Sequence, residues 1–325
     1  MKFLWTLRYG MEAAAIFVLI GLFRIIGLDA ASALGAFFGR QILYRTPLSG
    51  RARANLRTVY PWMSGGEIEF IIREMWDNLG RTVAEYAHLD KLSILGPDPR
   101  ISIDGLEHIA AARARGKGII FVSGHFASWE VMPFAATQLG IEGGEVYRPV
   151  NNPFVNAWLV RQRMKNGPKE QIAKGPHGTR RIFTLLRARK SVFLLVDQKT
   201  NEGVAVPFFG RDAMTTPAPA AFALKLGAVI LPVSNERHTG SRFRMTVHPP
   251  VEIQPSETHE RDVYALTLAI NETMEKMVRA RPSQWLWIHR RWPRPGDRPR
   301  SRRGKRVQDF AGDGVRVDRE GSSAT

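Results

Sequence analysis

The residue pair with the clearest catalytic potential in this chain is His125 and Glu130, five positions apart. Histidine titrates near neutral pH, so it suits the work of a general base. A carboxylate beside the far ring nitrogen holds the imidazole in one tautomer and stabilises the imidazolium that forms. Such a pair can take the proton of a hydroxyl group while that oxygen attacks a thioester carbonyl, without a serine or cysteine nucleophile. The pattern therefore indicates acyl transfer to a hydroxyl, and the alternative is a structural histidine near a surface glutamate.

A buried strand and a turn must position this pair. The continuous apolar run at 119–122 predicts a strand buried on both faces. It places His125 at its carboxyl edge, where ligand-binding and catalytic groups gather in α/β sheets. A helix is expected at 129–139. On one continuous helix His125 and Glu130 would lie about 140° apart, so we expect a turn between them, which Gly124 suits.

Strands and helices alternate on both sides of this segment. Apolar runs predict further strands at 101–104, 191–196 and 229–233, and an alternating edge strand at 243–247. Helices are expected at 66–78, 79–89, 106–115, 158–165 and 264–279, and a loop at 204–218. Repeated strand–helix alternation is typical of parallel sheets. We therefore predict an α/β fold with a mainly parallel central sheet flanked by helices.

The N-terminal segment has the composition of a membrane anchor. Residues 13–23 are apolar without interruption, and Arg24 breaks the run. A helix that spans a bilayer needs about 20 apolar residues, which this segment reaches only if Arg24 extends toward the lipid headgroups. We predict an uncleaved anchor that either spans the membrane or lies in its interface, with Trp5 and Tyr9 near the headgroups. A buried core helix is the alternative.

Composition sets broad limits. A length of 325 residues allows one large α/β domain with appendages or two small domains, and 44% hydrophobic residues are enough for a sizeable core. Cysteine is absent, so disulfides and thiolate metal sites are excluded. The net charge of +17 implies an anionic partner such as a membrane surface, an acidic protein or nucleic acid. We predict a membrane anchor and basic connector at 1–46, a catalytic domain at 47–293 and a basic, disordered tail at 294–325.

Five stretches in order carry a resemblance to a known family. GHFASWE, which contains His125 and Glu130, resembles the His-x4-Asp/Glu signature of the glycerolipid and lipid A acyltransferases. The other four resemble the late lauroyl/myristoyl acyltransferases of lipid A biosynthesis: VYRPVNNP (146–153), VRQR (160–163), LLVDQKTNEGVAVPFFGRDAMTTPA (194–218) and QWLWIHRRW (284–292). The resemblance extends over roughly residues 76–293.

This resemblance implies a glycerolipid acyltransferase-like fold and a membrane-bound enzyme. The enzyme would move a fatty acyl group from acyl carrier protein to a hydroxyl of a lipid A precursor, with no metal or bound cofactor. His125 would be the general base and Glu130 its orienting partner. The catalytic domain would lie on the cytoplasmic side of the inner membrane, where anionic lipid and the acidic carrier protein would meet the basic chain.

Five further residues are candidates for substrate binding. By resemblance, Arg161 matches the arginine implicated with the glutamate in the active site. A guanidinium fork can hold a phosphate of the acceptor or of the donor's phosphopantetheine arm, and Arg163 or Arg148 could do the same. Asp197 follows a predicted strand, as His125 does, and Tyr147 precedes Arg148 at another strand end.

Two alternatives remain open. The family usually has Gly-Asn where this chain has Ala127-Ser128, which leaves room for another acceptor, such as a lysophospholipid, ornithine lipid or glycosylated phospholipid. A non-catalytic basic protein that binds membrane or nucleic acid would explain the charge. No nucleic-acid recognition motif accompanies that charge, so no nucleic-acid partner is expected.

Overall fold

Seven strands form one sheet at the centre of the molecule, in the order β1-β9-β8-β2-β5-β3-β4. The computed structural model describes residues 2–201 and 203–292. The strands are β1 (Ile101–Asp104), β2 (Ile119–Ser123), β3 (Gly143–Tyr147), β4 (Glu170–Ala173), β5 (Ser191–Leu195), β8 (Val229–Thr239) and β9 (Arg242–Val247). Neighbouring strands are parallel except for the pair β8–β9. The predicted α/β fold with a mainly parallel sheet is therefore confirmed.

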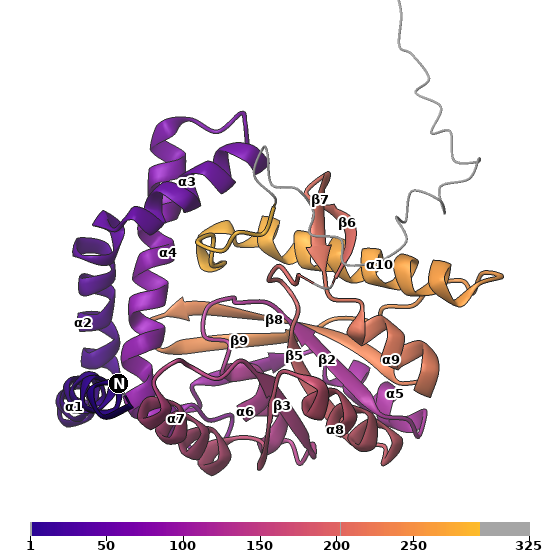
Figure 1. Ribbon diagram of the computed structural model, residues 1–325, viewed down its shortest axis with the longest axis horizontal. Coiled ribbons are helices and arrows are strands. Elements are labelled where there is room, and N and C mark those ends of the chain that lie inside the picture. The colour runs from indigo at the N-terminus through magenta and orange to yellow at the C-terminus, as the bar shows by residue number, and fades with distance from the viewer. Residues whose placement is uncertain (1, 202, 293–325) are drawn as a thin grey trace, which may run out of the picture.

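Helices cover both faces of this sheet (Figure 1). They are α1 (Lys2–Ile26), α2 (Leu28–Gln41), α3 (Pro47–Val59), α4 (Gly65–Glu85), α5 (Leu106–Ala114), α6 (Val131–Gln138), α7 (Pro153–Asn166), α8 (Pro176–Arg187), α9 (Ala218–Leu226) and α10 (His259–Ala280). Three short 3-10 helices complete the set: η1 (Leu43–Arg45), η2 (Tyr86–Lys91) and η3 (Pro282–Gln284).

The sequence of strand β2 is apolar because both faces of the strand are buried. Ile120 and Val122 belong to the hydrophobic cluster beneath α8, α9 and α10, whereas Ile119 and Phe121 belong to the cluster beneath α5 and α6. Successive side chains of a strand point to opposite faces, so a strand covered on both faces has no polar alternation. The predicted central strand is thus buried on both sides.

Helices α2 and α4 lie against each other at one end of the sheet (Figure 1). A Cβ on Gly35 would collide with the carbonyl oxygen of Gly80, and a Cβ on Gly39 would collide with that of Trp76. Glycine at these positions therefore allows the two backbones to approach closely. Because α2 packs on α4 in this way, residues 28–41 join the body of the protein. The predicted domain boundary at residue 46 stays a prediction.

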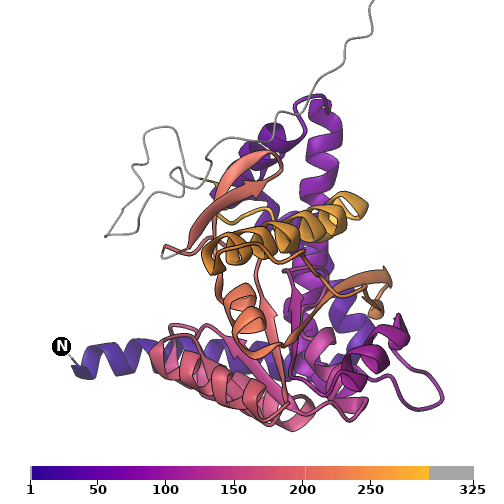
Figure 2. The same ribbon diagram turned by 90° about the vertical axis from the view of Figure 1, so that its right-hand side faces the viewer.

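Helix α1 exposes many apolar side chains, and its N-terminal end extends beyond the body (Figure 2). Trp5–Ile26 is long and apolar enough to cross a membrane, by length and composition. Val18 is 64% exposed and Ile25 is 81% exposed, so α1 is not the buried core helix of the alternative interpretation. Arg24 does not extend freely toward headgroups, because its guanidinium forms a two-point ion pair with Asp90.

Three local predictions were wrong. Residues 243–247 lie in β9, which is not an edge strand because it pairs with both β1 and β8. Alternation of apolar and polar residues shows that one face of a strand is buried, but it does not show how many strands lie beside it. The predicted loop at 204–218 contains a hairpin of β6 (Val204–Phe208) and β7 (Arg211–Thr215). Its turn residues Phe209 and Gly210 both have positive φ, without the usual Asn-Gly signal. Residues 66–89, predicted as two helices, belong mainly to α4, which a Ser64–Glu67 capping box begins.

The predicted tail at 294–325 lies outside the described residues.

Candidate active site

His125 and Asp197 meet at the carboxyl edge of the sheet. β2 and β5 are parallel neighbours whose last paired residues are Ser123 and Leu195. His125 and Asp197 each follow two residues later, so the register brings them together although they are 72 residues apart in sequence. His125 Nδ1 lies 2.8 Å from Asp197 Oδ1.

The carboxylate of Asp197 is buried, and both of its oxygens have hydrogen-bond partners. Its Oδ2 accepts hydrogen bonds from the backbone N–H of His125 and from Trp285 Nε1, each at 2.8 Å. Burial alone raises the pKa of Asp197, but the charge and hydrogen bonds of His125 outweigh burial and hold that pKa well below its usual range. An ionised Asp197 only accepts hydrogen bonds, so in the neutral form of the His125 ring the proton lies on Nδ1 and Nε2 presents its lone pair.

Glu130 does not take the predicted place beside His125. Its carboxylate accepts a hydrogen bond from Tyr86 Oη at 2.6 Å, and its Oε2 lies 3.0 Å from Arg163 Nε. Arg163 also lies 3.5 Å from a carboxylate oxygen of Glu145. The geometry thus gives the orienting position to Asp197 and pairs Glu130 with a buried arginine, because a turn between His125 and Glu130 does not determine where each side chain points.

The arginine beside the glutamate is Arg163 rather than the predicted Arg161. Both lie on α7, but residues two apart are separated by about 200° around a helix. Arg163 is buried against Glu130, whereas Arg161 is exposed. Arg163 therefore occupies the place beside the glutamate that the resemblance gave to Arg161, and substrate binding by Arg161 stays a prediction.

A cavity of about 330 Å³ lies beside the His125 ring. Its polar lining includes His125, Tyr147, Arg148 and Arg163, so the structure brings these four predicted residues together. Much of the remaining wall is apolar, including Met132, Leu159 and Phe193. A basic nitrogen therefore faces a space with both cationic and apolar walls.

Two polar residues close to His125 in this cavity were not predicted, Gln198 and His289. Gln198 Nε2 lies 3.0 Å from Nε2 of His125 and 3.0 Å from Nε2 of His289. Burial, together with the positive charge that His125 carries when protonated, lowers the pKa of His289 to about 4, so the His289 ring is neutral at pH 7. The sequence could have identified both residues, because Gln198 follows Asp197 directly and His289 lies in the QWLWIHRRW stretch.

Hydrogen bonds with α4 and η3 hold the backbone of the turn between His125 and Glu130. Ala127 has φ of 43°, a left-handed conformation that non-glycine residues rarely adopt. Its carbonyl oxygen accepts hydrogen bonds from Asn78 Nδ2 at 3.1 Å and Thr82 Oγ1 at 3.0 Å, and its N–H donates to Gln284 at 2.9 Å. Glycine suits this backbone best.

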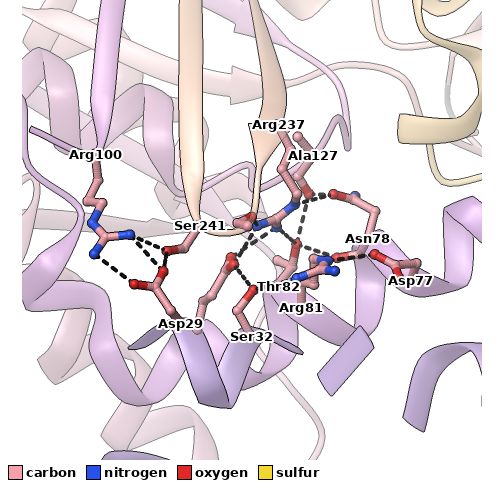
Figure 3. Close-up of polar contacts among 12 residues, drawn as sticks. Asp29, Ser32, Asp77, Asn78, Arg81, Thr82, Arg100, Ala127, Arg237 and Ser241 are labelled. Atoms are coloured by element: carbon pink, nitrogen blue, oxygen red, sulfur yellow. Dashed lines mark hydrogen bonds and ion pairs between the residues drawn. The ribbon is translucent and has the colours of Figure 1, made fainter. Parts of the chain in front are cut away.

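Arg237 of β8 binds the residues that hold this turn (Figure 3). Its Nε donates to Asn78 Oδ1 at 2.8 Å, and a terminal nitrogen donates to Thr82 Oγ1 at 3.1 Å. The same guanidinium forms a buried ion pair with Glu85. Asn78, Thr82 and Glu85 lie on one face of α4, so the network ties α4 and β8 to the turn that follows His125.

Comparison with known proteins supports the chemistry that this geometry indicates. Residues 1–294 match the model of the bacterial lipid A biosynthesis acyltransferase family. The chain is 28% identical over 257 residues to the lipid A biosynthesis palmitoleoyltransferase of Escherichia coli K12, covering 74% of this chain and 77% of that protein. It is 26% identical over 248 residues to the lipid A biosynthesis lauroyltransferase of the same organism, covering 73% and 76%.

A solved structure is also similar, at a greater distance. It is the 1-acyl-sn-glycerophosphate acyltransferase PlsC from Thermotoga maritima, with 13% identity, a TM-score of 0.36, and coverage of 77% of this chain and 97% of that chain. A match of this size supports no inference about substrate. The family match extends over 294 of the 325 residues, and the chain therefore belongs to the bacterial lipid A biosynthesis acyltransferase family.

Proposed function

We propose that this acyltransferase moves a fatty acyl group from the thioester of acyl carrier protein to a hydroxyl of a lipid A precursor. The observation that carries the proposal is the pair His125–Asp197, in which a buried carboxylate holds Nδ1 at 2.8 Å. The opposite ring nitrogen belongs to a residue that lines the cavity, where a hydroxyl can reach it. Family membership supports acyl transfer in lipid A biosynthesis.

His125 would act as general base and then as general acid. Its Nε2 takes the proton of the acceptor hydroxyl while the hydroxyl oxygen attacks the thioester carbon. Asp197 stabilises the imidazolium that results. The tetrahedral intermediate then collapses, the C–S bond breaks, and the departing sulfur takes the proton from Nε2. One ester bond forms, one thioester bond is lost, and the base returns to its starting state.

Gln198 must move aside during this cycle. Its amide nitrogen lies 3.0 Å from Nε2 of His125, the position that the acceptor hydroxyl needs. A neutral His289 on the other side of the same amide can accept its hydrogen bond. The apolar wall of the cavity suits the acyl chain of the donor, and Tyr147 and Arg148 border the space where polar parts of the substrates would lie.

The proposed location is the inner membrane, with the catalytic domain on the cytoplasmic side. The apolar surface of α1 supports membrane attachment, since most of its large apolar residues are exposed. The net charge of +17 favours both anionic lipid and an acidic carrier protein, and would speed their encounter with the enzyme.

Two measurements test this function. Purified full-length protein with acyl carrier protein donor should acylate a lipid A precursor; His125→Ala should abolish transfer, and the control His177→Ala, an exposed histidine on α8, should retain it. Full activity in His125→Ala would exclude the mechanism. Lysophospholipid, ornithine lipid and glycosylated phospholipid are assayed in parallel, and a clear preference for one of them would reassign the acceptor. Absence of transfer to every acceptor would favour the non-catalytic binding protein.

A further inference from the structure

Two cationic side chains, Arg148 and Lys174, line the cavity that contains His125. They follow two neighbouring parallel strands, β3 and β4, whose last paired residues are Tyr147 and Ala173. The backbone N–H of Lys174 donates to the carbonyl oxygen of Tyr147 at 2.9 Å, which continues the register by one step. Both residues therefore lie at the same carboxyl edge of the sheet as His125.

Within the described residues, the side chains of Arg148 and Lys174 form no hydrogen bond and no ion pair. Arg163 in the same cavity differs, because it pairs with two carboxylates, Glu130 and Glu145. Loss of hydration lowers the pKa of Lys174, and the positive charge of Arg148 acts in the same direction against the attraction of Asp197. Both side chains are exposed where they line the cavity, so an anionic group of a bound substrate can reach them.

We propose that Arg148 and Lys174 form a binding subsite for a phosphate group of a substrate. This proposal rests on the proposed function, and it specifies that a substrate carries a phosphate group. A guanidinium donates two parallel hydrogen bonds to phosphate oxygens, and an ammonium adds a compact positive charge. Phosphate occurs both in the phosphopantetheine arm of the donor and on the sugars of lipid A precursors, and the experiment distinguishes the two sources.

The kinetic test compares Arg148→Gln, Lys174→Gln and the double variant with two matched controls. Arg180→Gln and Lys117→Gln remove exposed charges outside the cavity, on α8 and before β2. Each subsite variant should raise the KM of the phosphate-bearing substrate about tenfold or more, because a charge-assisted hydrogen bond contributes this much. The value of kcat should stay within about threefold. The controls should leave both constants unchanged.

Pairs of substrates with and without a phosphate group then show whether the phosphate of the donor or that of the acceptor binds the subsite. If the donor phosphate binds here, the variants will raise the KM of acyl carrier protein donor but not that of an acyl N-acetylcysteamine thioester, which lacks phosphate. If the acceptor phosphate binds here, the variants will raise the KM of the phosphorylated precursor but not of its dephosphorylated form. An unchanged KM for both phosphate-bearing substrates in the double variant would overturn the proposal.

A binding measurement separates this proposal from the proposed function. Calorimetry on the full chain with phosphopantetheine and with a sugar phosphate does not require acyl transfer. The wild type should bind at least one of these probes about tenfold more tightly than the double variant. Equal binding by both proteins would exclude the subsite even if transfer is observed. Weaker binding by the double variant would support the subsite even if transfer to lipid A precursor is absent.

Discussion

Asp197 Oδ1 lies 2.8 Å from Nδ1 of His125, and the two residues follow the paired ends of neighbouring strands β2 and β5. The orientation of the imidazole therefore depends on the sheet register rather than on the five-residue spacing to Glu130. Glu130 instead forms a buried ion pair with Arg163. We propose that Asp197 serves activity and that Glu130 serves stability, and this separation can be tested.

Asp197→Asn should lower kcat about 10²- to 10⁴-fold, since an amide neither fixes the same tautomer nor stabilises the imidazolium. The amide oxygen can still accept from Trp285, so the fold should persist. Single-turnover transfer gives the rate, and circular dichroism with thermal melting serves as the control. Retention of more than a tenth of the wild-type kcat would show that Asp197 does not orient the base.

Glu130→Gln should lower the free energy of unfolding by about 3 kcal/mol, because it leaves Arg163 buried with only the more distant Glu145. Urea titration measures this value. The double variant Glu130→Gln/Arg163→Met should recover part of the loss, since both members of the pair are then uncharged. Additive losses in that double-mutant cycle would contradict a specific pair.

Glu145→Gln should flatten the dependence of stability on pH. Burial, with the negative charge of Glu130, raises the pKa of Glu145 to about 7 from an ordinary value of 4.5, against the attraction of Arg163. The folded chain binds this proton more tightly than the unfolded chain does. Its contribution to stability is therefore complete below about pH 4.5 and is lost as pH rises through about 7.

Urea titrations of the wild type and Glu145→Gln at half-unit steps from pH 5 to pH 8 measure the effect, with slopes that differ by at most about 1.4 kcal/mol per pH unit. The wild type should lose stability relative to the variant as pH increases. Parallel curves would mean that Glu145 has an unshifted pKa.

Gly39→Ala should destabilise the protein by about 2 kcal/mol or more, because its Cβ would collide with the backbone of Trp76 and push α2 away from α4. Gly50→Ala is the matched control. Gly50 lies in α3 with open space around it, so alanine there should stabilise the helix by about 0.5–1 kcal/mol. Equal thermal shifts in the two variants would show that α2 and α4 are not in close contact.

Ala127→Gly should change the free energy of unfolding by less than about 1 kcal/mol. Relief of a left-handed backbone returns about 1–2 kcal/mol, which the entropy of glycine and the lost buried methyl group offset. Ala127→Val should cost several kcal/mol, since a branched side chain is strained at φ of 43° and the site is fully buried. Chemical denaturation compares the two. Similar losses for glycine and valine would show that backbone conformation is not the limiting feature.

The amino-acid sequence by itself determined the fold class and the location of His125 in that fold. The apolar run of β2 predicted a strand buried on both faces, and His125 follows it at the carboxyl edge as expected. The apolar helix α1 could also be predicted from the sequence, because a long apolar segment is a local property of the chain. Periodicity and composition report such local features directly.

Only the tertiary structure decided which charged groups meet. β2 lies between β5 and β8, neither of which is its neighbour in sequence, so no local pattern could bring Asp197 to His125. The choice between Arg161 and Arg163 depended on which face of α7 turns inward. No apolar stripe marks that face, because polar residues occur on both faces of the helix. A buried charge selects its partner by proximity in space and by the cost of remaining unpaired, and both are set only when the strands and helices have packed.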